Sequence, residues 1–136
     1  MSSETGLRVL LVERDDDFRY VFALLLGLVG YRVETASNAA EAVASIKVFS
    51  PDVVLTELGL EHVGGLELAR QIRRLPLAGD IVLVALTAYV QKHSEAEASE
   101  AGFDYFVAKP VSVERIVAIF ESAEVMKDRR QSRWYH

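Results

Sequence analysis

The stretch of sequence that decides the fold is Pro51-Asp52-Val53-Val54-Leu55-Thr56-Glu57. A continuous run of Val and Leu is typical of a strand that is buried on both faces of a parallel sheet. Four further short segments have a strand-like character: Leu7–Val12, Tyr31–Ala36, Ile81–Leu86 and Phe103–Val107. We therefore predict five strands, with Glu57 at the carboxyl end of the third.

Helical periodicity separates these predicted strands. After the first strand, one helical face carries Phe18, Val21, Phe22, Leu25 and Val29. Similar stripes follow the second, third and fifth strands, and the Ala/Glu-rich segment Gln91–Ala101 follows the fourth. Asn38 and Ser112 are predicted helix N-caps. Pro76 and Gly102 are predicted to end the third and fourth helices. This alternation predicts an α/β fold with a parallel sheet, helices on both faces and right-handed crossovers.

Composition narrows the class of protein. The 136 residues are enough for one domain, and no apolar run approaches the ~20 residues of a membrane span. The absence of cysteine excludes disulfides and thiolate chemistry, and the three histidines are scattered. The net charge of −5 argues against nonspecific nucleic-acid binding by the main body, because such binding requires a basic surface that neutralises phosphates. We expect a cytoplasmic protein without a membrane segment. We also expect the domain to be followed by a basic and aromatic tail at 125–136.

Chemically active side chains lie at the ends of four predicted strands. Glu13 and Arg14 follow the first, Glu57 ends the third, Thr87 follows the fourth and Lys109 follows the fifth. In open α/β sheets, sites lie outside the carboxyl ends of the strands, near the switch point in strand order. The sequence therefore predicts that these acidic, basic and hydroxyl groups converge on one small surface.

Several motifs occur together in a characteristic order along the chain. They are Val9-Leu10-Leu11-Val12-Glu13-Arg14-Asp15, the 51–57 stretch, Gly64-Gly65-Leu66, Ala85-Leu86-Thr87-Ala88, Ala101-Gly102-Phe103-Asp104 and Ala108-Lys109-Pro110. With these motifs, residues 6–124 resemble a response-regulator receiver domain of the chemotaxis-regulator type. The resemblance implies a doubly wound (βα)5, flavodoxin-like sheet of order 2-1-3-4-5. It also implies a non-enzymatic role in two-component phosphorelay signalling, with a histidine kinase or a downstream target as partner.

The resemblance assigns roles to particular positions. Glu57 occupies the phosphoacceptor position, and Thr87 and Lys109 occupy the positions that contact phosphoryl oxygens. Thr87 and Phe106 are the positions that move together as a switch. The acidic pocket that holds Mg²⁺ in the family corresponds to Glu13, Arg14 and Asp15.

Three positions in the matched region depart from the pattern of the family. Glu57 stands where an aspartate is usual, Arg14 replaces the second acidic residue, and Glu61 replaces a loop proline. A guanidinium at a ligand position places positive charge where the metal belongs, so we expect no bound metal. Since Arg forms bidentate pairs with carboxylates, we expect Arg14 to replace the ion by pairing with Glu57 or Glu13. These departures predict a pseudo-receiver that acts through protein–protein interaction.

Other interpretations remain open from the sequence. A one-residue slip in the match would make Asp15 the metal ligand, and Glu57 is able in principle to form an acyl phosphate. A flavodoxin-like flavin binder is a third class, although the charged loop Glu13–Asp17 would repel a phosphate group. The surface of the fourth helix, fifth strand and fifth helix, which includes Tyr89 and Val90, is the expected partner face. A homodimer through that same face is an alternative.

Overall fold

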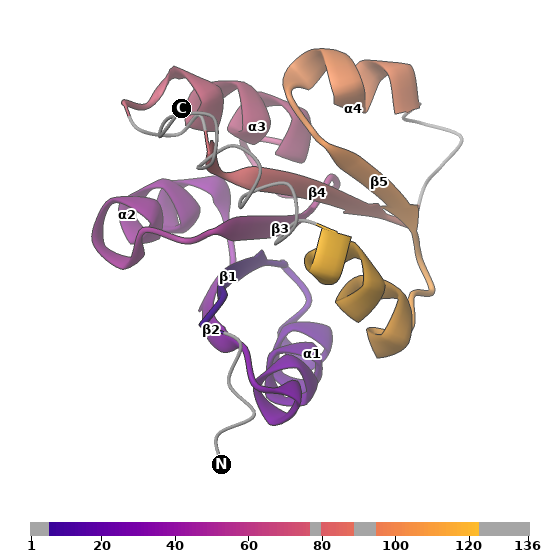
Figure 1. Ribbon diagram of the computed structural model, residues 1–136. Helices are drawn as coiled ribbons and strands as arrows, with labels where there is room; N and C mark the ends of the chain where they lie inside the picture. The colour runs from indigo at the N-terminus through magenta and orange to yellow at the C-terminus, as the bar shows by residue number, and fades with distance from the viewer. Residues whose placement is uncertain (1–5, 77–79, 89–94, 123–136) are drawn as a thin grey trace, which may run out of the picture.

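The computed structural model of the chain describes residues 6–76, 80–88 and 95–122. Five strands form one parallel sheet: β1 (Arg8–Val12), β2 (Arg32–Ala36), β3 (Val53–Glu57), β4 (Val82–Thr87) and β5 (Tyr105–Ala108). Their order is β2-β1-β3-β4-β5, which confirms the predicted doubly wound α/β fold (Figure 1). In this order β2 and β5 are the edge strands, and β1, β3 and β4 lie between them.

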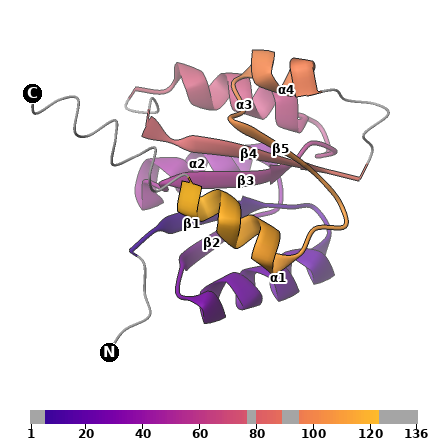
Figure 2. The same cartoon turned by 45° about the vertical axis from the view of Figure 1, so that its right-hand side comes forward.

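Helices cover both faces of the sheet. They are α1 (Asp16–Val29), α2 (Ala39–Phe49), α3 (Gly65–Arg74), α4 (Glu95–Ala101) and a further helix over residues 113–122. The two views show α1 and the 113–122 helix on one face and α2, α3 and α4 on the other (Figures 1 and 2). The predicted start of α4 at Gln91, with Tyr89 and Val90, lies outside the described residues. None of the helices formed by the described residues has the length and hydrophobicity of a transmembrane helix.

Local capping interactions set the helix ends. The Asn38 side chain accepts a hydrogen bond from the Glu41 N–H at 2.9 Å, and the Ser112 hydroxyl accepts one from the Arg115 N–H at 3.1 Å. Both predicted N-caps are therefore confirmed. Gly102 follows α4 with a φ of 116°, a backbone conformation that favours glycine.

The strand boundaries differ from the prediction by one residue in β1, β2 and β4, and by two at the start of β5. The last strand begins at Tyr105 rather than at Phe103. The Phe103 N–H instead donates to the Ala98 carbonyl and closes the end of α4. The aromatic ring of Phe103 is buried in the core, so Phe103 is apolar because it packs there and not because it belongs to the strand.

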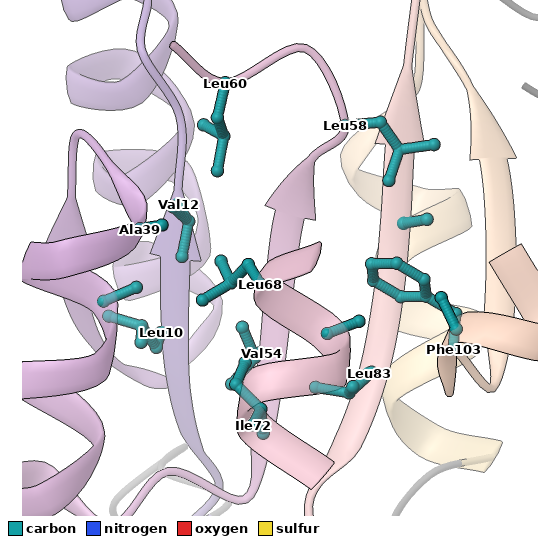
Figure 3. Close-up of a cluster of buried hydrophobic side chains, with 14 of the residues drawn as sticks. Leu10, Val12, Ala39, Val54, Leu58, Leu60, Leu68, Ile72, Leu83 and Phe103 are labelled. Carbon is teal, nitrogen blue, oxygen red and sulfur yellow. The ribbon is translucent and has the colours of Figure 1, made fainter. Parts of the chain in front are cut away.

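Two apolar clusters hold the layers together, one on each face of the sheet. On the face of α2, α3 and α4, Leu10, Val54 and Leu83 from the central strands pack against Leu68 and Ile72 of α3 (Figure 3). Each such fully buried aliphatic side chain contributes about 1.5–3 kcal/mol to folding. This packing fixes the positions of the central strands and therefore of their carboxyl ends.

The orientation of α1 differs from the stripe read from the sequence. Phe22 and Leu26 are its buried residues, whereas Val21 and Leu25 are 51% and 39% exposed. Because α1 is apolar around most of its circumference, periodicity alone does not orient it. The helix thus retains an apolar face toward solvent.

Candidate acidic pocket

Four predicted site residues meet at the carboxyl edge of the sheet. Glu57 and Thr87 are the last residues of β3 and β4, and Glu13 and Lys109 directly follow β1 and β5. The exposed fractions are 2% for Glu13, 5% for Glu57 and 1% for Thr87. Parallel strands end at the same edge of a sheet, and this geometry brings the four residues together as predicted.

Lys109 is the centre of this pocket. Its Nζ lies 2.6 Å from Glu13 Oε1 and 2.7 Å from Glu57 Oε2, so one ammonium bridges both carboxylates. The same Nζ lies 4.5 Å from the centroid of the Phe18 ring, within the range of a cation–π interaction. The three groups carry a net charge of −1, since two carboxylates face one ammonium.

Backbone N–H groups occupy the second oxygen of each carboxylate. Glu13 Oε2 accepts a hydrogen bond from the Asp15 N–H at 3.0 Å, and Glu57 Oε1 accepts one from the Gly59 N–H at 2.9 Å. Buried carboxylates are tolerated when they are paired and hydrogen-bonded, and both conditions are met here. Each carboxylate is consequently fixed at both oxygens.

The protonation of Lys109 reflects this environment. Burial lowers the pKa of Lys109, but the hydrogen bonds to Glu13 and then to Glu57 outweigh burial. The net result is a pKa of Lys109 above its ordinary value of 10.5. Lys109 is therefore protonated and positively charged at neutral pH.

The expected pairing of Arg14 with Glu57 or Glu13 is wrong. Arg14 is half-exposed, and its Nη1 lies 3.8 Å from Glu61 Oε1. Successive side chains at the end of a strand point in opposite directions, so Glu13 turns inward and Arg14 turns outward. The cation that pairs with both buried carboxylates is Lys109. Two of the three departures from the family pattern, Arg14 and Glu61, pair with each other at the surface.

The donor set does not fit the Mg²⁺ that the resemblance implies. Magnesium requires oxygen ligands in near-octahedral geometry. Glu13 and Glu57 are bonded to Lys109, and the exposed Asp15 carboxylate caps α1 by accepting the Phe18 N–H at 3.0 Å. Across residues 6–76, 80–88 and 95–122, no group of three His, Cys, Asp or Glu side chains is placed to hold a metal ion.

The two switch positions lie on adjacent strands. Thr87 is buried at the end of β4, and its carbonyl accepts the Lys109 N–H at 2.8 Å. Phe106 is half-buried on β5, directly beside β4, where Ala85 is its register partner. Phe106 packs against the core cluster on the face of α2, α3 and α4. Their coupled movement remains a prediction.

Sequence reasoning missed three contributors to the pocket. In the sequence Phe18 belongs only to a helical stripe, and nothing marks it as a neighbour of Lys109. No sequence motif marks Gly59 as the donor to Glu57. Gly65 belongs to the Gly64-Gly65-Leu66 motif, but the motif does not show why glycine is needed there. A Cβ at Gly65 would lie 2.6 Å from the Glu57 carbonyl oxygen and 2.7 Å from the Leu58 Cα. The close approach of the α3 N-terminus to the backbone below Glu57 therefore requires glycine.

This contact makes a testable prediction. Replacing Gly65 with alanine should destabilise the protein by about 2 kcal/mol, because a methyl group meets rigid backbone and forces α3 away from β3. Gly64→Ala is a matched control, since its nearest non-neighbouring atom would lie 3.7 Å away. Urea unfolding of both variants measures the difference, and equal midpoints would contradict the prediction.

The strand order and the buried acidic pocket at the carboxyl edge define the chain as a flavodoxin-like α/β protein with a receiver-type site. Residues 9–121 match the model of the response regulator receiver domain, and the chain belongs to this family. It is 33% identical over 113 residues to the phosphate regulon transcriptional regulatory protein PhoB of Pseudomonas aeruginosa, covering 83% of this chain and 49% of that protein. The chain thus spans about half the length of this relative.

Other relatives are matched over most of their length. The polar-differentiation response regulator DivK of Brucella anthropi is 27% identical, with 84% of this chain and 93% of DivK covered. Among solved structures, a CheY-like receiver domain from Methylobacillus flagellatus superposes with a TM-score of 0.79 at 25% identity, covering 88% and 99% of the two chains. The receiver domain of a sensor histidine kinase from Pseudomonas aeruginosa PAO1, solved with magnesium coordinated in its active-site cleft, also has a TM-score of 0.79, at 26% identity and 87% and 97% coverage.

Proposed function

We propose that this receiver domain, residues 6–124, works as a pseudo-receiver whose acidic pocket is closed by its own lysine. The observation that carries the proposal is the bridge from Lys109 Nζ to Glu13 at 2.6 Å and to Glu57 at 2.7 Å. Signalling would then depend on contacts with protein partners of a two-component pathway rather than on Mg²⁺-dependent aspartyl phosphate. The cytoplasmic location expected from the sequence stays a prediction.

The physical basis is competition for a single cation. Phosphoryl transfer depends on positioning and on cations that neutralise the phosphoryl oxygens. Here the Lys109 ammonium already contacts two carboxylates, and the Gly59 N–H holds the other oxygen of Glu57. The half-exposed Arg14 adds a positive charge beside the pocket and further disfavours a divalent ion. An incoming phosphoryl donor would have to displace Lys109 without help from a metal.

The test is chemical modification of the full chain. Incubation with acetyl phosphate and Mg²⁺ should leave the intact mass unchanged, and beryllofluoride with Mg²⁺ should leave the near-ultraviolet spectrum unchanged. A phosphoryl adduct mapped to Glu57 would overturn the proposal and support a competent acceptor. The Glu57→Gln variant identifies any adduct at another residue.

A gain-of-function variant provides the positive control. Arg14→Asp with Glu57→Asp restores two aspartates of the family pattern: the first change adds a carboxylate, and the second shortens the side chain at the acceptor position. This double variant should bind Mg²⁺ and accept phosphate, as measured by metal titration and intact mass. If it remains inert while staying folded, the loss of these two residues is not what prevents phosphorylation.

The proposed partners are proteins, either a histidine kinase or a downstream target. The support is family membership together with the half-buried Phe106 on the outer strand β5, whose Val107 belongs to the same apolar cluster as Ile116 of the 113–122 helix. Part of the expected partner face, including Tyr89 and Val90, lies outside the described residues. The basic tail 125–136 stays a separate predicted segment.

A further inference from the structure

Among the strands of the described residues, β2 lies at the edge of the sheet, and one row of its backbone groups has no strand partner there. The Arg32 N–H donates to the Leu7 carbonyl, and the Ala36 carbonyl accepts the Glu13 N–H. Backbone groups alternate in direction along a strand, so those of Arg32, Glu34 and Ala36 point toward β1. The N–H and C=O groups of Val33 and Thr35 therefore point outward.

An apolar face of α1 lies directly beside this edge. Tyr20, Leu24 and Leu28 recur every four residues and are 71%, 53% and 74% exposed. With Val33 and Thr35 of β2 they line one groove between the helix and the strand. A row of large exposed apolar side chains beside an open strand edge marks an interaction site.

The charges on β2 indicate what fits this edge. Arg32 and Glu34 are exposed and lie on the sheet face opposite to Val33, because side chains alternate along a strand. Neither forms an ion pair with another residue in the described part of the chain. In a twofold contact residue i meets residue j of the second copy and j meets i, so opposite charges two residues apart on one strand can pair with each other across an antiparallel contact.

We propose that the chain forms a homodimer by antiparallel pairing of β2 with β2 of a second copy, about a twofold axis through Val33. In this register Val33 lies opposite Val33, and Arg32 lies opposite Glu34 of the second copy, twice by symmetry. In this register the outward N–H and C=O groups of Val33 pair with those of Val33 in the second copy. Thr35 lies opposite Tyr31 of the second copy, and the Tyr31 N–H already donates to the Leu26 carbonyl of its own chain. A register centred on Glu34 would place like charges opposite each other, which is unfavourable.

The α1 helices support the same arrangement. A twofold axis perpendicular to the sheet keeps both α1 helices on one face of the joined sheet. Tyr20, Leu24 and Leu28 of one copy would then approach the same residues of the other and leave water. The joined sheet has no exposed β2 edge, and the acidic pocket at the carboxyl ends of the strands is not used by the contact.

Charge reversal tests the register. Arg32→Glu and Glu34→Arg should each weaken the dimer at least about tenfold, because symmetry turns two attractive pairs into two repulsive ones. An equimolar mixture of the two variants should recover association as a heterodimer, and the double variant should recover the homodimer. Sedimentation equilibrium of the full chain measures all four. A wild-type chain that stays monomeric over a wide concentration range, or variants that dimerise as well as the wild type, would overturn the proposal.

Cysteine cross-linking tests the contact independently, since the chain has no native cysteine. Two residues opposite each other in a hydrogen-bonded antiparallel pair have Cα atoms about 5.5 Å apart, which suits a disulfide. Val33→Cys should therefore form a covalent dimer under mild oxidation. Ala118→Cys, exposed on the 113–122 helix, is the matched control. A covalent dimer through Ala118→Cys but not through Val33→Cys would place the contact at the 113–122 helix and refute pairing of β2.

Discussion

Replacing Lys109 with methionine should destabilise the folded state by about 3–5 kcal/mol at neutral pH, the cost of leaving a buried charge without its partner. Methionine keeps most of the volume of the lysine stem but removes the ammonium that bridges Glu13 and Glu57. Both carboxylates are almost fully buried, so water does not replace the lost cation. Chemical denaturation with a fluorescence or circular dichroism readout measures the loss.

A compensating variant separates charge from packing. In Lys109→Met with Glu13→Gln and Glu57→Gln, the pocket is neutral and the amides retain acceptors for the Asp15 and Gly59 N–H groups. This triple variant should recover at least half of the lost stability. A triple variant as unstable as Lys109→Met would show that packing of the lysine stem, and not its charge, holds the pocket together.

The stability difference between the wild type and Lys109→Met should depend on pH, and the pKa of Lys109 gives the direction of that dependence. Because the folded-state pKa of Lys109 lies above 10.5, folding favours the protonated amine. The stabilisation is fully present below pH 10.5 and is lost as the pH rises through the folded-state pKa. The stability gap between wild type and Lys109→Met should therefore narrow above pH 10.5. Taking the difference between the two proteins removes the titration of tyrosines common to both.

Arg73→Ala should be the second large effect, with a loss of about 2–3 kcal/mol. The Arg73 guanidinium donates to the Gly102 carbonyl through Nε at 3.0 Å and Nη2 at 2.8 Å, and to the Ile81 carbonyl through Nη1 at 2.8 Å. It also pairs with Asp104 at 3.0 Å. One side chain of α3 thus joins the start of β4 to the segment between α4 and β5, and hydrogen bonds to charged groups are worth more than neutral ones.

Two comparisons make this prediction specific. Arg73→Lys should recover little, since one ammonium cannot reproduce the planar fork. Arg74→Ala should change stability by less than about 0.5 kcal/mol. Arg74 is exposed, and its ion pair with Glu67, at 3.6 Å, lies at the surface, where such pairs contribute little. Amide exchange at Phe103 and Asp104 should accelerate in Arg73→Ala and not in Arg74→Ala. Similar unfolding midpoints for both alanine variants would contradict the assigned role.

Much of the fold was predictable because its signals are local. Runs of aliphatic residues mark strands that are buried on both faces, and Asn38 and Ser112 cap helices within a few residues of themselves. The convergence of Glu13, Glu57, Thr87 and Lys109 was also predictable, since it needs only the rule that parallel strands end at one edge. The orientation of α1 was not predictable, because apolar residues surround that helix.

The amino-acid sequence by itself determined the order of strands and helices along the chain, because that order follows from periodicity. It also determined which charged residues lie at the carboxyl edge, because they directly follow the predicted strands. Only the tertiary structure decided which cation meets the buried carboxylates. Lys109 reaches both of them from the end of β5, whereas Arg14 turns outward to Glu61. The physical reason is that pairing among long side chains depends on burial and on direction at the strand ends, and these are set by packing between segments far apart in the chain.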